Sequence, residues 1–342
     1  MGGSDVSGAA PAAGLVDRFG RVHRDLRISL TDRCSLRCTY CMPAEGVPWL
    51  PGASMLTTTE LVRAAAVAVE LGIREIRLTG GEPLLRPDVV DVVAALARLG
   101  PAGAHPEISL TTNALRLPAL AGPLKDAGLT RVNVSLDTLD RARYQQLTRR
   151  DRLPEVLAGL AAARAVGLEP IKLNAVAMRG VNDAEVVDLV RFAVDQGYEM
   201  RFIEQMPLDA GHTWDRTAMV TQAEILDALT GAFDLTPVPG RGAAPAARWL
   251  IDGGPRTVGV IASVTAPFCG ACDRIRLTAD GQLRACLFAR SETDLRSILR
   301  AGGDDAELAA AFRGCLAGKR AGHDIDDPSF LQPERPMSAI GG

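Results

Sequence analysis

The sequence contains no apolar run that approaches the length of a membrane-spanning helix, and residues 1–16 lack a basic segment followed by an apolar one. The formal net charge of −3 is small, so the composition predicts neither nucleic acid nor a membrane surface as a partner. The phosphate-binding P-loop pattern is absent, and no glycine-rich dinucleotide fingerprint follows a predicted strand. A nucleotide bound by this chain would therefore be held by side chains.

Cysteines are present, but they are clustered rather than scattered. Seven Cys in 342 residues, without a secretion signal, favour metal ligation in a reducing cytosol over disulfides. This pattern predicts a cytoplasmic protein. The length suits one large domain or two modest ones. Residues 1–16 are rich in Gly, Ala and Ser, and we expect them to form a disordered tail.

Short apolar runs alternate with amphipathic helical patterns between residues 26 and 206. We expect strands at 26–30, 74–79, 107–111, 131–136, 171–177 and 200–205, and helices near 58–71, 88–99, 118–127, 154–166 and 183–196. Thr57 and Glu60 form a capping-box pattern at the first helix. Strands separated by helices imply parallel pairing. A full (β/α)8 barrel needs about 250 residues, so we expect an incomplete (β/α)6 barrel, with a doubly wound open sheet as the alternative.

Polar, Gly or Cys residues follow nearly every expected strand, which favours the barrel, because parallel barrels build their sites at this rim. Past residue 206 the alternation of strand and helix patterns ends. A Gly/Pro/Ala-rich stretch at 237–247 precedes two hairpin-like pairs, 248–251 with 257–262 and 274–279 with 282–287, and helices near 291–301 and 305–317. These boundaries predict a tail at 1–16, a partial barrel at 17–235 and a C-terminal α+β extension at 236–342.

Three cysteines, Cys34, Cys38 and Cys41, follow the first strand at C-x3-C-x2-C spacing. They are one too few for a four-iron cube, in which each iron normally takes one thiolate. The fourth iron would be open to a ligand from outside the protein. One βα unit later, Gly80-Gly81-Glu82-Pro83 ends a strand. The two glycines let the backbone approach a ligand closely, and Glu82 could accept hydrogen bonds from an ammonium group.

A second set of three cysteines lies in the C-terminal region, at Cys269, Cys272 and Cys286. Zinc, with His212 or His323 as a fourth ligand, is one interpretation. A second iron–sulfur cluster with one open iron is the other, and the first set makes it more plausible. Cys315 lies on the apolar face of an expected helix, so we interpret it as a buried core thiol.

Several cations lie on expected strands or beside the cysteines rather than on helix surfaces. They are Arg27, Arg77, Lys172, Arg201, Arg274 and Arg276. Each could simply face solvent or pair with a carboxylate. Together they could form a positive pocket suited to a polyphosphate.

These residues resemble a known family. C-x3-C-x2-C with Tyr40 before its last cysteine, followed by Gly80-Gly81-Glu82-Pro83, is similar to the radical S-adenosylmethionine (SAM) superfamily. Within it, the chain resembles the GTP 3′,8-cyclases, the molybdenum cofactor biosynthesis protein A family. The strings that carry this likeness are Thr31 to Pro43, Leu147-Thr148, Ile171 to Val176, Arg179 to Asp183, Phe202 to Glu204, Met206 to Leu208, the second cysteine set with Arg274-Ile275-Arg276, and Gly341-Gly342.

The resemblance implies two [4Fe–4S] clusters, SAM as cofactor and GTP as substrate. The product would be (8S)-3′,8-cyclo-7,8-dihydroguanosine 5′-triphosphate, formed in the first step of molybdenum cofactor biosynthesis. The first cluster would be held by Cys34, Cys38 and Cys41, and the second by Cys269, Cys272 and Cys286. SAM contacts would come from Tyr40, Gly81, Ser135 and Met206. GTP contacts would come from Arg27, Arg77, Thr111, Lys172, Arg274, Ile275 and Arg276. Gly341 and Gly342 would reach into the site and assist the reaction.

Two other classes of protein remain open at this point. A different two-cluster radical SAM enzyme, such as a peptide-modifying maturase, usually carries more C-terminal cysteines and no R-x-R after them. A non-catalytic zinc or iron–sulfur protein would not need the Gly-Gly-Glu-Pro segment. The resemblance further implies a reductant such as flavodoxin and a downstream cyclic pyranopterin monophosphate synthase as partners. We expect a monomer or homodimer.

Overall fold

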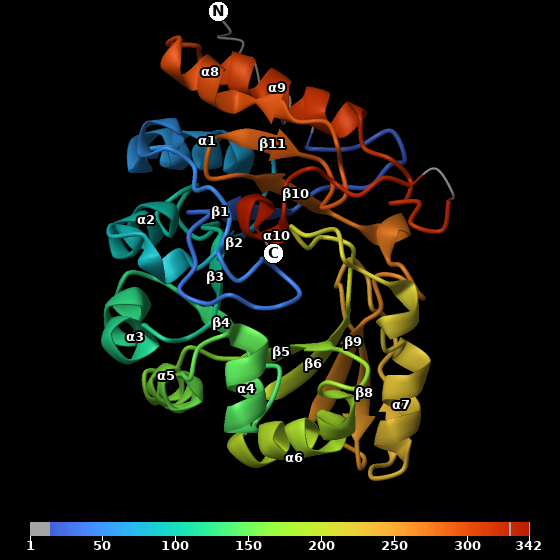
Figure 1. The fold of residues 1–342 in the computed structure, drawn as a ribbon. Helices are drawn as coiled ribbons and strands as arrows, with labels where there is room; N and C mark the ends of the chain where they lie inside the picture. The colour runs from blue at the N-terminus through green and yellow to red at the C-terminus, as the bar shows by residue number, and fades with distance from the viewer. Residues whose placement is uncertain (1–13, 328–329, 342) are drawn as a thin grey trace, which may run out of the picture.

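The computed structural model describes residues 14–327 and 330–341. At its centre is a curved sheet whose first six strands run parallel and are joined by helices that lie outside it (Figure 1). The strands are β1 (Asp25–Ser29), β2 (Glu75–Thr79), β3 (Glu107–Thr112), β4 (Arg131–Ser135), β5 (Lys172–Ala177) and β6 (Glu199–Glu204). They neighbour one another in sequence order. A doubly wound sheet would reverse its strand order, so the incomplete barrel is confirmed.

The expected helices of the barrel all form, with ends within a few residues of the predicted ones. They are α1 (Thr58–Glu70), α2 (Val89–Leu96), α3 (Leu117–Asp126), α5 (Leu153–Ala165) and α6 (Val186–Gln196). The capping box is present: the backbone N–H of Glu60 donates to Thr57 Oγ1 at 3.2 Å, and the N–H of Thr57 donates to Glu60 Oε2 at 2.8 Å. It satisfies two backbone donors that the start of a helix leaves without partners.

Three α-helices of the described residues were not predicted: α4 (Arg141–Thr148), α7 (Gln222–Thr230) and the short α10 (Met337–Ile340). Helix α4 is mostly polar and buries only Tyr144, Leu147 and Thr148, so it shows little apolar periodicity. Helix α7 is short, yet its start carries a capping box between Thr221 and Glu224. That box was the signal that could have found it.

The two C-terminal hairpins extend the same sheet at its opposite edges. Strand β9 (Thr257–Ile261) pairs parallel with β6 and is followed outward by β8 (Ala247–Ile251) and β7 (Leu235–Pro237). Strand β10 (Arg274–Leu277) pairs parallel with β1 and is followed outward by β11 (Gln282–Arg284) and β12 (Thr293–Asp294). The segment between β9 and β10 therefore joins the two sides of the incomplete barrel. It carries Cys269 and Cys272.

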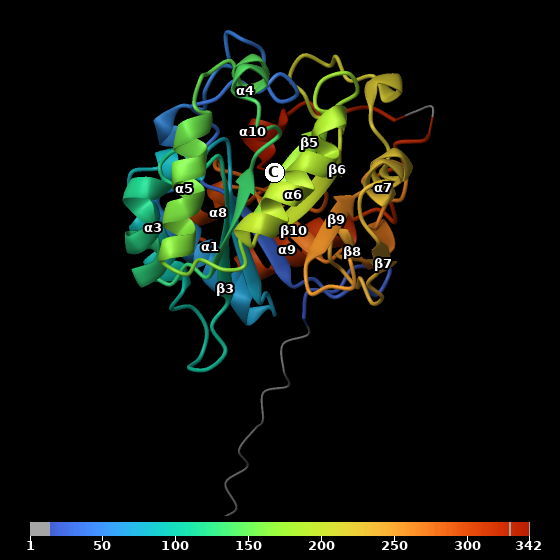
Figure 2. The same ribbon diagram turned by 90° about the horizontal axis from the view of Figure 1, so that it is seen from below.

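Helices α8 (Leu295–Arg300) and α9 (Asp305–Ala317) pack beyond β11, close to α1 (Figure 1). The last helix, α10 (Met337–Ile340), lies near the middle of the curved sheet in both views (Figures 1 and 2). Within the described residues, no helix is both long and apolar enough to cross a membrane.

The prediction of a disordered tail over residues 1–16 is wrong for its last three residues. Residues 1–13 lie outside the described part of the chain, but residues 14–16 are ordered. Leu15 is fully buried, its N–H donates to Leu71 O at 3.1 Å, and its carbonyl accepts from His23 N at 2.7 Å. An apolar side chain placed against the core stabilises this segment, which composition alone does not reveal.

Alternate residues of the barrel strands face in opposite directions, and the two faces differ in character. Leu26 and Ile28 of β1 belong to the hydrophobic core under the helices, whereas Arg27 lies between them and faces the other way. The same alternation places polar residues on the inner face of the other strands: Arg77, Ser109, Asn133, Lys172, Asn174 and Arg201. An ordinary closed barrel is filled with apolar side chains. This one has a polar interior face, which suits a charged ligand.

Candidate active site

The first three cysteines lie in the long loop after β1 and line one cavity. Cys34, Cys38 and Cys41 are all free thiols and all face this cavity, together with Gly80, Gly81 and other residues from the ends of β2 to β4. The middle of the motif is tied to the segment after β4, because Thr39 N donates to Leu147 O at 2.9 Å, and a turn within the motif is closed by Cys41 N donating to Cys38 O at 2.9 Å. The structure thus brings the first predicted cysteine set together.

Gly80 and Gly81 pack directly against the backbone of this loop. A Cβ on Gly81 would lie 2.4 Å from Arg33 O and 2.5 Å from Asp32 O, and one on Gly80 would lie 2.4 Å from Thr31 O. The N–H of Gly81 donates to Thr31 O at 2.7 Å. Gly80 also has a φ of +143°, a backbone conformation that is strained for any residue with a side chain. Two glycines are therefore needed to dock β2 onto the cysteine loop.

Glu82 follows β2 and is hydrogen-bonded within the chain. Its side chain is 1% exposed and accepts three hydrogen bonds from the chain: from Leu84 N (3.0 Å), Thr112 Oγ1 (2.7 Å) and Asn113 N (2.7 Å). Burial raises the pKa of Glu82, although these hydrogen bonds oppose the shift. Most of its acceptor capacity is used internally. Glu82 therefore joins the end of β2 to the end of β3.

A tyrosine and an aspartate form a second connection across the cavity. Tyr40 Oη donates to Asp137 Oδ2 at 2.9 Å, and Asp137 Oδ1 accepts from Val176 N at 2.8 Å. Burial raises the pKa of Asp137 to about 6. Tyr40, between two of the cysteines, is thereby fixed to the ends of β4 and β5. No local sequence pattern indicates this contact between Asp137 and Tyr40, which lie 97 positions apart.

The thiols of the first set are partly buried, and their surroundings favour the uncharged form. Burial raises the pKa of all three, that of Cys41 to about 12. A bound metal removes such protons outright. Across residues 14–327 and 330–341, no three His, Cys, Asp or Glu side chains gather around a point that could hold a single metal ion. A cube differs because it binds each thiolate at a different iron. Three soft donors around one cavity fit such a cluster.

The second cysteine set also converges. Cys269 lies in the short helix η5 (Cys269–Ala271), Cys272 precedes β10, and Cys286 follows β11. All three line a single cavity with Arg274, Arg276, Met206 and His323. The ring of His323 is engaged elsewhere, since Nε2 lies 2.7 Å from Ser263 O and Nδ1 accepts from Ile325 N at 3.2 Å. His323 is therefore not poised as a fourth ligand.

The environments of Cys269 and Cys272 differ. Burial raises the pKa of Cys269. Burial acts in the same direction on Cys272, but Arg274 and Lys319 outweigh it and lower the pKa of its thiol. Cationic neighbours favour the thiolate, which is the form that binds iron.

The predicted substrate cations are cross-strand neighbours on the inner face. Arg276 pairs with Arg27 in register, and Arg27 pairs with Arg77. Burial lowers the pKa of all three, that of Arg276 to about 10, and it lowers the pKa of Lys172 to about 8. Asp25 is 3.8 Å from Arg27, and Glu199 lies opposite Lys172 in register. Cations outnumber anions here, so a polyanion would relieve their repulsion.

Unsatisfied polar atoms mark the same inner face. Buried side-chain atoms without a hydrogen-bond partner include Arg27 Nε, Asp25 Oδ1, Asn133 Oδ1, Asn174 Oδ1 and Arg274 Nη2. Leaving such groups unpaired costs about 1–3 kcal/mol each. A polar ligand with phosphate and hydroxyl groups fits this surface.

The residues predicted to contact SAM or GTP do not all lie in the same cavity. Tyr40, Gly81, Ser135 and Thr111 line the first cavity, whereas Met206 lines the second. Ile275 is fully buried in the core between its two arginine neighbours, so only its backbone can contact a ligand. Cys315 is only partly buried but packs against the core, and burial raises the pKa of its thiol to about 11.

The C-terminal segment links the two cavities. The backbone N–H of Ser338 donates to Cys41, and Met337 and Ser338 line the first cavity. Gly341 O accepts from Arg276 Nη1, and Gly341 lies against Thr79 and Ser29. Gly342 lies outside the described residues. Sequence reasoning had not predicted a contact from this segment to a cysteine.

Comparison with known proteins assigns the class first. Residues 28–193 match the radical SAM superfamily, and residues 198–325 match the family described as Molybdenum Cofactor Synthesis C. Among solved structures, the fold is similar to Streptococcus suis SuiB (TM-score 0.58, 14% identity, 90% of this chain and 69% of that chain) and to SuiB bound to S-adenosylmethionine (TM-score 0.56, 14% identity, 90% and 67%). The chain is a radical SAM protein.

Relatives then give the particular family. The chain is 59% identical over 331 residues to the GTP 3′,8-cyclase of Streptomyces coelicolor, covering 96% of each protein. It is 57% identical over 347 residues to the GTP 3′,8-cyclase of Mycobacterium ulcerans, covering 99% of this chain and 96% of the relative. The chain belongs to the GTP 3′,8-cyclase family. Two [4Fe–4S] clusters and SAM are the cofactors of this family.

Proposed function

We propose that this chain is a lyase that converts GTP to (8S)-3′,8-cyclo-7,8-dihydroguanosine 5′-triphosphate, the first step of molybdenum cofactor biosynthesis. The observation that carries the proposal is the joint arrangement of two three-cysteine cavities and a cationic inner sheet face between them. The match to GTP 3′,8-cyclases over nearly the whole chain supports it. A non-catalytic binding module would not need several buried cations in register on one sheet face, two of which line the second cavity.

Cys34, Cys38 and Cys41 would hold the first cluster and leave one iron for SAM. When bound, this cluster and SAM supply the one-electron chemistry that removes a hydrogen atom from the ribose of GTP. Tyr40, Gly81 and Ser135 would contact SAM from the cavity wall, as their positions there support. Met206 would contact it from the second cavity, at the boundary between the two sites.

Cys269, Cys272 and Cys286 would hold the second cluster and leave one iron for the guanine of GTP. Arg27, Arg77, Lys172, Arg274 and Arg276 would bind the triphosphate, since they supply buried positive charge on one face. Thr111 and the backbone of Ile275 would add contacts. This surface would hold the ribose between the clusters and keep water away, which lowers the entropic cost of ring closure.

The C-terminal glycines would complete the site. Gly341 already contacts the side chain of Arg276 through its carbonyl oxygen. Gly341 and Gly342 would therefore lie beside bound GTP and help to orient it. In the proposed division, residues 17–235 form the barrel and residues 236–342 supply the second cluster and this tail.

Partners and location are further parts of the proposal. A one-electron donor such as flavodoxin would reduce the clusters, and a cyclic pyranopterin monophosphate synthase would consume the product. Free thiols throughout the described residues support a reducing, cytoplasmic environment. We expect no nucleic acid or membrane partner, and a monomer or homodimer.

The experiment uses Cys41→Ser in anaerobically reconstituted protein. The unaltered chain should bind about eight irons and form 5′-deoxyadenosine from SAM when GTP is supplied. Cys41→Ser should lose SAM cleavage but keep GTP affinity, which depends on the other cavity. Loss of GTP affinity with unchanged circular dichroism would show that the two-site assignment is wrong. Tetrahedral zinc and no SAM binding in the unaltered chain would favour a non-catalytic protein.

A further inference from the structure

Behind the second cysteine set, away from the inner sheet face, lies a buried lysine. The sequence has only three lysines, and Lys319, just after α9, is 3% exposed. Its Nζ lies 3.6 Å from Cys272 Sγ, 2.7 Å from Arg274 O and 2.8 Å from Ala285 O. An ammonium group has three donors, and these three acceptors use all of them.

The two carbonyls belong to the segments that carry Cys272 and Cys286. Arg274 is two residues after Cys272, and Ala285 directly precedes Cys286. One ammonium group therefore fixes the separation between two of the three cysteines of the set. This connection spans β10 and β11 at the ends where the thiols leave the sheet.

The charge of Lys319 has no carboxylate partner within the part of the chain that the structure describes. Its hydrogen-bond acceptors are one sulfur and two carbonyl oxygens, and among the described residues the anionic groups that act on it are the thiolates of Cys272 and Cys286. A buried cation without a counter-charge is costly. The groups placed to supply that charge are the thiolates of the second set.

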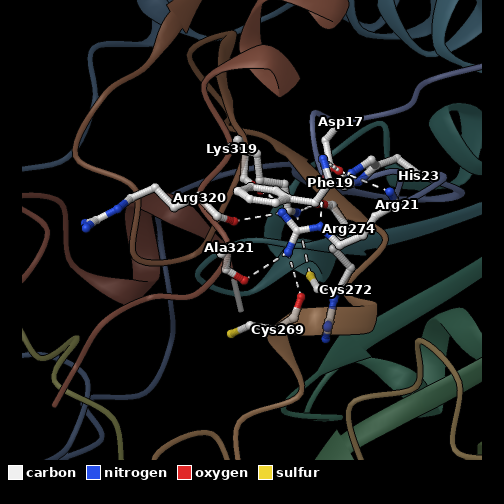
Figure 3. Close-up of polar contacts among 11 residues, drawn as sticks. Asp17, Phe19, Arg21, His23, Cys269, Cys272, Arg274, Lys319, Arg320 and Ala321 are labelled. Atoms are coloured by element: carbon white, nitrogen blue, oxygen red, sulfur yellow. Dashed lines mark hydrogen bonds and ion pairs between the residues drawn. The ribbon is translucent and has the colours of Figure 1, made fainter.

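A clamp from the N-terminal segment holds the chain around Lys319 in place (Figure 3). The guanidinium group of Arg21 donates to Cys269 O at 2.7 Å, to Arg320 O at 2.7 Å and to Ala321 O at 3.1 Å. Arg21 Nε in turn pairs with the carboxylate of Asp17 at 2.5 Å. Segments about 250 and 300 positions later in the sequence are thereby joined to one another.

We propose that Lys319 is a positioning residue for the second cluster: its ammonium group holds the segments of Cys272 and Cys286 and donates a hydrogen bond to the Cys272 sulfur. A hydrogen bond and a positive charge at a ligand sulfur stabilise the reduced, more negative state of a cluster. Lys319 therefore raises the reduction potential of the second cluster. The inference rests on the proposed assignment of that cluster to Cys269, Cys272 and Cys286.

The test is a redox titration of the full chain in a Cys41→Ser background, where the second cluster is observed alone by electron paramagnetic resonance. Lys319→Met removes the charge and keeps the length of the side chain. We expect about four irons and a midpoint potential lower by at least 59 mV, a tenfold change for a one-electron couple. Lys125→Met is the matched control, because Lys125 is exposed on α3 and donates to Gly167 O.

Each outcome has a distinct meaning. If the Cys41→Ser parent binds no iron, the second-cluster assignment fails, whatever Lys319 does. If Lys319→Met keeps four irons and its cluster has the same midpoint potential as that of Lys125→Met, the role of Lys319 is overturned. Loss of iron from Lys319→Met alone, with unchanged circular dichroism, supports positioning. If iron-free Lys319→Met does not fold, Lys319 serves the fold rather than the cluster, and the inference is likewise overturned.

Discussion

Asp17 is the residue on which the buried clamp behind the second cavity depends. Its carboxylate accepts from Arg21 Nε, His23 Nε2, and the N–H groups of Phe19 and Arg21. Burial alone would raise the pKa of Asp17, but hydrogen bonds from His23, Arg21 and the backbone lower it to about 2. A pKa below the unfolded value means that the ionised group stabilises the fold.

We expect Asp17→Asn to lower the free energy of unfolding by about 2 kcal/mol at pH 7. Because the folded pKa is depressed, this contribution is complete above pH 4 and is lost as the pH falls toward 2. Chemical denaturation of the iron-free chain at several pH values measures it. Asp126→Asn, on the exposed end of α3, should change stability by less than about 0.5 kcal/mol. If the difference in unfolding free energy between the two variants stayed constant down to pH 2, the ionised carboxylate of Asp17 would not be the source of the stabilisation.

At the scale of elements, the docking of β2 onto the cysteine loop decides whether the first cluster site exists. The contact between Gly81 and two backbone carbonyls leaves no room for a side chain. Glu82 continues the connection to β3, and Tyr40 extends it to β4 and β5 through Asp137. Four strand ends therefore hold one loop.

Gly81→Ala should lower the iron content of the reconstituted chain from about eight toward four. Its Cβ would meet Arg33 O at 2.4 Å, so the loop must move, at a cost of about 1–3 kcal/mol. Iron analysis and thermal unfolding measure both effects. Gly122→Ala is the control: no atom lies within 4 Å of its added Cβ in α3, and alanine favours helices. Equal iron contents in the two variants would refute the role of this contact.

At the scale of the whole molecule, the C-terminal segment connects both cavities to the edge of the sheet. Arg335 pairs with both carboxylate oxygens of Asp280, at 3.0 and 2.8 Å, and with Glu292 at 2.9 Å. Asp280 lies in the turn between β10 and β11. From this anchor, the chain runs back to Cys41 and Arg276.

Deletion of residues 337–342 should leave the iron content near eight but reduce GTP cyclisation on the order of 100-fold. The cysteines and Arg335 remain, whereas Arg276 loses Gly341 and Cys41 loses the Ser338 amide. Product formation and iron content are measured on the same preparation. Glu334→Gln, exposed just before the deleted segment, should leave both unchanged. Full activity after the deletion would remove the tail from the proposed site.

Features that depend on neighbouring residues could be predicted from the sequence, whereas features that depend on contacts between distant residues could not. Periodicity and capping residues are local, so the six barrel strands and the Thr57 capping box were predictable. Helix α4 was missed because its exposed polar residues leave no apolar stripe, and the order of residues 14–16 was missed because it depends on the burial of Leu15. Lys319 stands in an unremarkable Gly-Lys-Arg string. Nothing local indicates that it is buried against a cysteine.

The sequence by itself determined the two cysteine sets, the barrel units and the family, because ligand spacing and strand periodicity are properties of neighbouring residues. Only the tertiary structure decided that the two C-terminal hairpins join opposite edges of one sheet. It also decided that Glu82 is hydrogen-bonded to the end of β3 and that Arg21 and Lys319 contact the second cysteine set. These contacts join residues far apart in the chain, and only burial and charge in the folded molecule select them.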